Sequence, residues 1–371
     1  MATLNRWAGW RNRLLSQHDL RRRLQRFPLT RPTARRRAAD LFAVNAGFIN
    51  SQVLAACLEL DLLERLSDQA ATAEQLAGEL ELDALRLTRL LEASAELGLL
   101  ERRRRDHWGL GAQGAVLRSD PGMMAMSLHH RALYTDLSEP VALLRNPPPS
   151  TQLAKLWPYA GTNQPEDLPA KATERYTKLM ADSQRMVAEQ ILDAYDFGRH
   201  RSVLDLGGGS GAFLTAVAKA HPEPALTLLD LPAVIPHSEA ALNRQELSSR
   251  VTRVGGDFFR DPLPQGHDLM TLVRIVHDHD DEPIRGLLAR IFEALPPGGT
   301  LLIAEPMLGR HDRGGQVGNY FRFYLMAMGS GRPRSKRELG RMLKTAGFRR
   351  VRNHGTDVPL ICSVISARKP G

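Results

Sequence analysis

The sequence predicts an α/β protein in which a mostly parallel, doubly wound sheet of seven strands follows a smaller helical domain. From residue 201 onward, short apolar runs of strand length alternate with helical segments, as in a Rossmann-like sheet. Residues 39–100 instead place apolar side chains at three- and four-residue spacing, the pattern of amphipathic helices. A chain of 371 residues is long enough for two domains.

Residues 1–38 are predicted to form a basic arm. Residues 1–40 contain eleven Arg, no Lys and two Asp, whereas the remaining 331 residues balance 39 basic against 39 acidic side chains. The net charge of +9 therefore belongs to the arm. With Trp7 and Trp10 near its start, the arm could lie on an anionic membrane surface, contact nucleic acid, or form a solvated helix over the domain.

The compartment is predicted to be cytoplasmic. The first fifteen residues lack the apolar stretch of a secretory signal, and no apolar run reaches the roughly 18 residues that cross a bilayer. The cysteines, Cys57 and Cys362, lie far apart in apolar segments, as expected for buried free thiols in a reducing compartment.

Residues 39–120 show the helix, helix, β-wing order of a winged helix. A capping box of Thr72 and Gln75 predicts one helix start, and two short strands flank the basic turn of Arg102 to Arg105. Winged helices often bind DNA, so a cofactor-sensing regulator is an alternative. The helix at 85–97, which would read bases, is mostly Leu, Ala and Glu. A dimerisation role is therefore favoured.

Residues 121–175 are expected to be a largely irregular linker with substrate-side helices, including the Pro-rich segment NPPPS at 146–150. A long helix at about 173–196 then leads into the second domain, residues 176–371. Its strand candidates are SVLDLG, ALTLLDL, VTRVGGDF, DLMTLVRIV, TLLIAEPM, RVRNHG and LICSVISAR, with a helix at about 335–346 before the last two.

A glycine turn, VLDLGGGSGAF, follows the first of these strands. Gly207, Gly209 and Gly211 let the backbone turn tightly and approach a ligand closely, and Asp205 precedes them. Ligands of doubly wound sheets bind at the carboxyl ends of the strands. The same turn fits the GxGxxG pattern of nicotinamide enzymes, which remain a competing interpretation.

Acidic residues at the next two strand ends favour a nucleoside cofactor. Asp230, followed by Leu231, is placed to bind both hydroxyls of a ribose. Asp257 suits an adenine amino group, and Phe258 suits the flat face of the base.

These residues resemble the DxGxGxG, strand-two acid and GD motifs of class I S-adenosylmethionine-dependent methyltransferases. DLPAVI, GDFF, RIVHDHDDEP and LPPGGTLLIAEPM are similar to the O-methyltransferase family that includes plant phenolic and bacterial polyketide enzymes. The resemblance implies a last strand that is antiparallel, S-adenosylmethionine as methyl donor, and a winged-helix dimerisation domain, hence a homodimer. LWPYA, GDFFRDPLP and AMGSGRPRS resemble more closely the members in purple photosynthetic bacteria that methylate hydroxylated carotenoids. A bacteriochlorophyll precursor or an aromatic polyketide is the alternative substrate.

The segment RIVHDHDDEP, residues 274–283, could bind a metal, hold a catalytic base or form a polar loop. The resemblance implies that His277 is the general base, with Asp278 beside it and Glu305 orienting it. Methyl transfer requires no metal, and no second cluster of ligands at suitable spacing accompanies the segment, so no metal is expected.

Other family positions are matched less closely. The resemblance implies cofactor contacts for Tyr176, Met180 and Arg274, although a helix face in the core explains the first two nearly as well. A second framing glutamate of the plant enzymes falls at Pro333 here. This departure is compatible with a different acceptor, such as an aliphatic alcohol.

Two Met-rich segments are candidates for the substrate pocket. Phe321, Tyr324 and Met328 lie in one, and Met124 lies in the other. Flexible thioethers suit a long, irregular apolar ligand, although a plain core has the same composition. We expect a hydrophobic substrate, by resemblance a carotenoid, and no specific nucleic acid. The basic arm could then contact the cytoplasmic face of the photosynthetic membrane.

Overall fold

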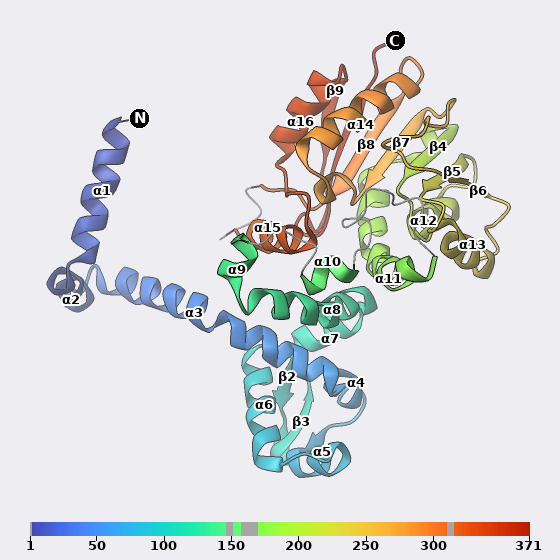
Figure 1. The fold of residues 1–371 in the computed structure, drawn as a ribbon. Coiled ribbons are helices and arrows are strands. Elements are labelled where there is room, and N and C mark those ends of the chain that lie inside the picture. Colours follow the sequence, from blue (N-terminus) through green and yellow to red (C-terminus); the bar gives the residue numbers. More distant parts are fainter. Residues whose placement is uncertain (1, 146–150, 157–169, 310–314) are drawn as a thin grey trace. The chain divides into compact units, whose positions relative to one another are not determined.

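The computed structural model describes residues 2–145, 151–156, 170–309 and 315–371. The chain divides into two compact units, Met1–Arg118 and Ser119–Gly371, and each is described by itself (Figure 1).

The first unit is helical with a small sheet. Its helices are α1 (Ala2–Ser16), α2 (His18–Arg26), α3 (Arg31–Glu59), α4 (Leu62–Arg65), α5 (Ala73–Leu80), α6 (Ala84–Glu96) and α7 (Ala112–Arg118). An antiparallel sheet has the order β1 (Ala71–Thr72), β3 (His107–Leu110), β2 (Leu100–Arg102). The Thr72–Gln75 capping box is confirmed at the start of α5. Cys57 is buried and lies 2.9 Å from Ser94 Oγ, so it is a core thiol.

Helix α3 runs without interruption through the expected boundary at residue 38. The expectation that no segment is apolar enough to cross a bilayer is wrong for this helix, which has an 18-residue window of hydropathy 1.5. Counting uninterrupted apolar runs missed it, because Asn45 and Asn50 break the run. Its carboxyl-terminal end packs against α4 and α6 and buries Cys57 and Leu58, so length and hydropathy are weak evidence for a span.

The second unit contains the predicted seven-stranded sheet. The order is β6 (Val251–Gly255), β5 (Ala225–Asp230), β4 (Ser202–Leu206), β7 (Leu269–Val273), β8 (Thr300–Glu305), β10 (Ser363–Arg368), β9 (Arg349–His354). Strand β10 is antiparallel to both neighbours, and the other pairs are parallel. The predicted class I arrangement, with the last strand antiparallel, is confirmed.

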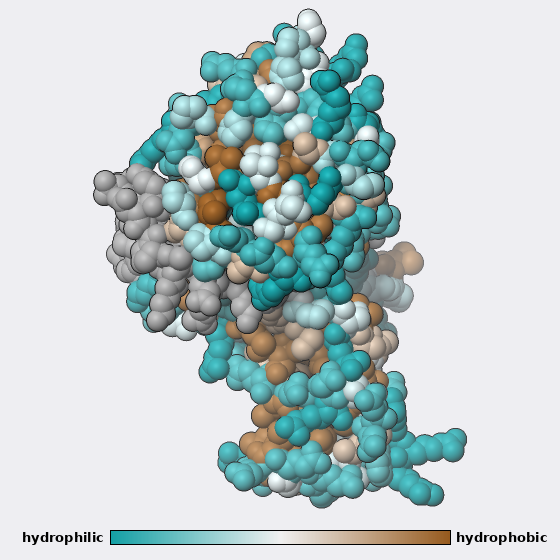
Figure 2. Space-filling view, turned by 90° about the vertical axis from the view of Figure 1, so that its right-hand side faces the viewer, coloured by the Kyte–Doolittle hydropathy of each residue, from teal (hydrophilic) through white to brown (hydrophobic). Residues whose placement is uncertain are grey.

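Helices cover both faces of this sheet (Figure 1). One apolar cluster joins the sheet to α11 (Ala170–Ala194), α12 (Ala212–Ala220) and α13 (Ile235–Arg244). The other joins it to α14 (Asp281–Ala294) and α16 (Lys336–Thr345), whose start has the capping box of Ser335 and Glu338. The face of this unit seen in Figure 2 is largely hydrophilic, with apolar patches near its middle.

The expectation of a largely irregular segment at 121–175 is wrong where the structure describes it. The segment contains α8 (Pro121–Leu137), α9 (Pro140–Arg145) and α10 (Gln152–Leu156), while NPPPS lies outside the described residues. The missed signal is a cap: Asp120 accepts a hydrogen bond from the Met123 N–H, and Pro121 occupies the first helical position.

Candidate active site

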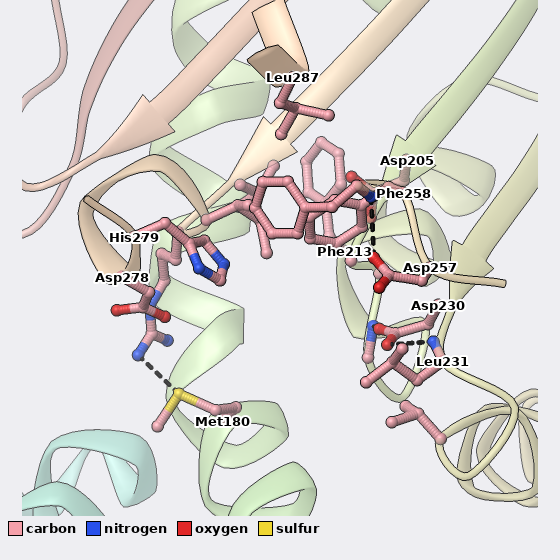
Figure 3. Close-up of a pocket in the computed structure, with 18 of the residues that line it drawn as sticks. Met180, Asp205, Phe213, Asp230, Leu231, Asp257, Phe258, Asp278, His279 and Leu287 are labelled. Carbon is pink, nitrogen blue, oxygen red and sulfur yellow. Dashed lines mark hydrogen bonds between the residues drawn. The ribbon is translucent and has the colours of Figure 1, made fainter. Parts of the chain in front are cut away.

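A cavity of about 580 Å³ opens at the carboxyl ends of β4, β5 and β7. Asp230 and Asp257 lie on one side of it, and Asp278 and Met180 lie on the other (Figure 3). The predicted cofactor residues that line it are Asp205, Gly207, Gly209, Asp230, Leu231, Asp257, Phe258, Arg274 and Met180. Tyr176 belongs to α11, but its side chain lies outside the described part of the chain.

The glycine turn borders the cavity with bare backbone. Gly207 and Gly209 have φ values of +73° and +58°, in the left-handed region that favours glycine. A Cβ on Gly209 would meet no atom within 4 Å, so it would occupy open space. Gly211 does not line the cavity: it begins α12 at φ +78°, and a Cβ there would touch Leu242. In this structure it has a role in the helix start, and its contact with a ligand stays a prediction.

Backbone N–H groups orient the carboxylates at the ends of β5 and β6. Asp230 accepts hydrogen bonds from Gly209 and Leu231, both at 2.7 Å, and burial raises the pKa of its carboxyl to about 6. Asp257 accepts a hydrogen bond from the Phe259 N–H at 2.8 Å. Each carboxylate keeps further acceptor capacity for hydroxyl or amino donors.

Asp205 has an oxygen without a partner. Its Oδ1 accepts a hydrogen bond from Thr271 Oγ1 at 2.6 Å, but its buried Oδ2 has no hydrogen-bond partner among the described residues. Burial, together with the charge of Asp230, raises the pKa of this carboxyl to about 7. A buried acceptor without a donor is unfavourable, so this oxygen points to a donor supplied by a ligand.

Arg274 connects the end of β7 to α11. It adopts φ +58°, an uncommon conformation for a residue with a side chain. Its guanidinium donates to Ser183 Oγ at 2.7 Å and to the Met180 sulfur at 3.0 Å. These contacts hold α11 at the wall of the cavity.

His277 lies between two carboxylates in the 3₁₀ turn η5 (Val276–Asp278). Its Nε2 is 3.0 Å from Asp278 Oδ1, and its Nδ1 is 3.5 Å from Glu305 Oε2. The same Glu305 oxygen accepts the His277 backbone N–H at 2.9 Å. Burial lowers the pKa of the imidazole, but Asp278 and Glu305 outweigh it and raise that pKa overall. Burial in turn raises the pKa of the Glu305 carboxyl.

Asp278 and His277 face different surroundings. Asp278 lines the cavity, whereas His277 and Glu305 do not. The His277 ring instead lies 5.5 Å from the ring of Phe321 in α15 (Gln316–Met328). His277 Nε2 is thus paired with a carboxylate that lines the cavity, an arrangement that spacing alone did not indicate.

A buried arginine missed by the sequence reasoning holds this turn in place. The Arg334 side chain is 0% exposed and donates to the carbonyls of Val276 at 2.6 Å and His279 at 2.8 Å. It also contacts Asp281 at 2.7 Å, and Arg332 forms a second, bidentate pair with Asp281 at 3.0 and 2.9 Å. Hydrogen bonds from Arg332 and Arg334 lower the pKa of Asp281 to about 2. The sequence signal for it is RPR at 332–334.

The expected substrate residues are brought together only in part. Tyr324 and Met328 are buried in an apolar cluster with Leu133 of α8 and Leu153 of α10, rather than lining the described cavity. Met124 is half-buried on α8 and is not in this cluster. The sequence reasoning also missed two polar pairs that cross it, His129 with Tyr324 at 3.2 Å and His130 with Tyr320 at 2.8 Å.

The acidic segment after β7 provides the N-cap position of helix α14 and an acceptor for Arg332 and Arg334. Asp280 is the N-cap residue of α14, and Asp281 accepts from Arg332 and Arg334. Within the described ranges, no group of three or more His, Cys, Asp or Glu side chains is arranged to hold a metal ion.

A class I sheet with a glycine turn and three strand-end carboxylates defines an α/β enzyme with a site for a nucleoside-type cofactor. Residues 134–349 match the family model of the O-methyltransferase domain, and residues 43–117 match that of the O-methyltransferase dimerisation domain. The chain belongs to the O-methyltransferase family. A DNA-binding regulator is accordingly not favoured.

Relatives of this chain include two bacterial enzymes of one name. It is 43% identical to the demethylspheroidene O-methyltransferase of Rhodobacter capsulatus over 93% of this chain and 86% of that protein. It is 39% identical to the demethylspheroidene O-methyltransferase of Cereibacter sphaeroides over 93% and 91%. Human N-acetylserotonin methyltransferase, solved in complex with S-adenosylmethionine, shares the fold with a TM-score of 0.72 and 24% identity, covering 90% of this chain and 98% of that one.

Proposed function

We propose that this protein methylates the hydroxyl of a hydroxylated carotenoid, with S-adenosylmethionine as the methyl donor. The main structural support is the cavity that contains three strand-end carboxylates. Asp278 in the wall of this cavity is paired with the buried His277. The acceptor class is supported by the two relatives named for demethylspheroidene.

The residues present fit this donor. S-adenosylmethionine is a cation that carries an ammonium group, ribose hydroxyls and an adenine amino group, and when bound it supplies an activated methyl group. The unpaired Oδ2 of Asp205 would accept from the ammonium group. Asp230 would bind the ribose hydroxyls, and Asp257 and Phe258 would bind the adenine.

His277 is the proposed base. Its Nε2 lies 3.0 Å from Asp278, and despite burial the two carboxylates raise its pKa, so they stabilise the imidazolium relative to the neutral ring. Loss of that proton makes Nε2 an acceptor, and the substrate hydroxyl can then donate to it at the edge shared with Asp278. The two carboxylates stabilise the imidazolium that forms as the hydroxyl proton arrives. An aliphatic hydroxyl is a weak acid, so its proton leaves late and positioning matters more than base strength.

Assembly and location are part of the proposal. The matched dimerisation domain supports a homodimer. The middle of α3 exposes Leu41, Phe42, Val44 and Phe48, which a second copy would cover. We place the protein in the cytoplasm, with its arginine-rich arm and Trp7 and Trp10 on the membrane that holds the carotenoid.

A methyl-transfer assay tests the chemistry. Full-length protein would receive labelled S-adenosylmethionine and a 1-hydroxycarotenoid in detergent, with chelator present. We expect label in the carotenoid fraction of the wild type. The rate of methyl transfer in His277→Ala should be lower by about 100-fold or more. Binding of S-adenosylhomocysteine should stay unchanged, and exposed His18→Ala is the matched control. Cofactor binding without transfer to any hydroxycarotenoid would refute the substrate class, and equal rates in the two histidine variants would refute the base.

A further inference from the structure

A second cavity, of about 270 Å³, lies at the opposite end of the same sheet. Asp268 directly precedes β7 and Thr300 begins β8, so this cavity is at the amino ends of two strands, and the carboxyl end of one of them, β7, borders the first cavity. Tyr195 and the 3₁₀ turn η4 (Phe197–Arg199) form another wall. The cavity begins where the apolar core ends: Val364 is in the core, and Ser366 and Arg368, on the same face of β10, line the cavity.

Four guanidinium groups line this cavity. Arg199 comes from η4, Arg350 and Arg352 from β9, and Arg368 from β10. The register of β9 against β10 is irregular between Arg349 and Arg352, Arg352 is paired with Ser366, and both Arg350 and Arg352 line the cavity. Arg350 has φ +48°, an uncommon backbone conformation for a residue with a side chain.

The cavity has little negative charge to offset these arginines. Asp268 is its one lining carboxylate, and it already accepts from the N–H groups of Arg201 and Ser202 and lies 3.6 Å from His200. Arg199 pairs with Asp196 outside the cavity lining. The guanidinium groups of Arg350 and Arg352 make no hydrogen bond or ion pair with any other residue that the structure describes.

The neutral side chains of the cavity are mostly paired with each other. Tyr195 Oη lies 2.8 Å from His200 Nε2, and His354 Nε2 lies 2.7 Å from Ser366 Oγ. Burial, with Arg199 and Arg352 nearby, lowers the pKa of His354, so this ring adds no charge at neutral pH. The unused hydrogen-bonding capacity of the site is therefore cationic, and it belongs chiefly to Arg350 and Arg352.

We propose that this cavity is a binding site for a phosphate group. Guanidinium forks match the oxygens of phosphate, and a phosphate has enough oxygens and charge to engage several of them. Drug-sized ligand pockets occupy about 300–1,000 Å³, so this smaller cavity suits a mono- or diphosphate or a lipid headgroup rather than a whole nucleotide cofactor. The site is separate from the methyl-transfer cavity, and the proposal does not depend on the proposed function.

Titration calorimetry of the full-length protein with sodium pyrophosphate, at ionic strength held constant with sodium chloride, tests the site. We expect one saturable site per chain. Arg350→Gln and Arg352→Gln should each weaken it about tenfold, as expected when a charged hydrogen-bond donor is lost. The control is Arg244→Gln, an exposed arginine on α13 whose guanidinium donates to the Ala240 carbonyl of the same helix. Absence of a saturable site, or an equal loss in the control, would overturn the proposal.

Vesicle flotation distinguishes the two sources of phosphate. Wild type and the double variant Arg350→Gln, Arg352→Gln would be compared on phosphatidylglycerol and phosphatidylcholine vesicles. Loss of both pyrophosphate and phosphatidylglycerol binding in the double variant supports a lipid headgroup. Loss of pyrophosphate binding alone supports a soluble phosphate compound, with vesicle binding carried by the amino-terminal arm. Retention of both overturns the site.

Discussion

Replacing Arg334 with methionine should slow methyl transfer far more than it weakens cofactor binding. The guanidinium is fully buried and donates to the carbonyls on either side of His277, those of Val276 and His279. Methionine keeps much of the side-chain length and volume but donates nothing. The turn that carries His277 would then keep only the Glu305 carboxylate on the His277 N–H and the Ser330 hydroxyl on the Asp278 carbonyl, among the side-chain hydrogen bonds to its backbone that the structure describes.

The stability change can be bounded from the same contacts. Removing one partner of a buried ion pair costs about 3–5 kcal/mol. Asp281, however, is 31% exposed and keeps its bidentate pair with Arg332, so its charge is not left alone. The loss is then mainly two charge-assisted hydrogen bonds to carbonyls, one buried and one partly buried, and we expect the free energy of unfolding to fall by about 3 kcal/mol. A misplacement of about 1 Å at His277 would slow the chemical step by up to roughly 100-fold.

The assay pairs urea unfolding with single-turnover methyl transfer at a temperature where all variants are folded. Arg332→Met is the matched control, because Arg332 binds the same Asp281 but is 42% exposed and donates to Asp281 and Glu338 rather than to the His277 turn. Arg334→Lys should recover part of the rate. If Arg334→Met and Arg332→Met slowed turnover equally, or if Arg334→Met lost cofactor affinity in proportion to rate, the positioning argument would be refuted.

Four further predictions concern the catalytic base and the cofactor site. His277 accepts a proton only when it is neutral, and the carboxylates raise its pKa above the ordinary 6.5 despite burial. The single-turnover rate should therefore rise about tenfold per pH unit below that pKa and level off above it. A flat pH–rate profile would contradict the assignment of His277 as the base. Burial raises the pKa of Asp205 to about 7, so binding of cationic S-adenosylmethionine near pH 6.5 should release protons. Calorimetry in buffers of different ionisation enthalpy measures this release. Asp205→Asn should abolish it, and equal release in both proteins would refute the contact between Asp205 and the cofactor. The same shift means that the unliganded protein should lose stability as pH rises from about 4 to 7, because the folded state holds a proton that the unfolded chain has lost. Gly209→Ala should weaken S-adenosylhomocysteine binding by roughly tenfold, because the added methyl group would fill open space at the turn. Gly211 is also at positive φ but lies outside the cavity, so Gly211→Ala should change stability rather than affinity.

The fold could be predicted because its determinants are local. Buried parallel strands are continuous apolar runs, as in LMTLV of β7, and every strand of the larger sheet was located from such runs or from its neighbours. The helix starts at Thr72 and Ser335 follow from side chains three residues apart. The helix α8 was missed because its mixed Met and His composition gives weak periodicity, although Asp120 and Pro121 specify its start.

The strand-end acids were predictable for a related reason. Once the strands are parallel, their carboxyl ends share one edge, so Asp205, Asp230 and Asp257 must meet there whatever the loops do. The sequence by itself therefore determined the sheet, the glycine turn and this acidic edge.

The tertiary structure alone decided that Asp278 lines the cavity beside His277, and that Arg334, distant in sequence, supports both sides of that turn. It also decided that arginines of η4, β9 and β10 converge at the far end of the sheet. Such contacts depend on the path of the loops between residues that are far apart in the chain. Because they leave no periodic pattern in the sequence, they cannot be predicted from it.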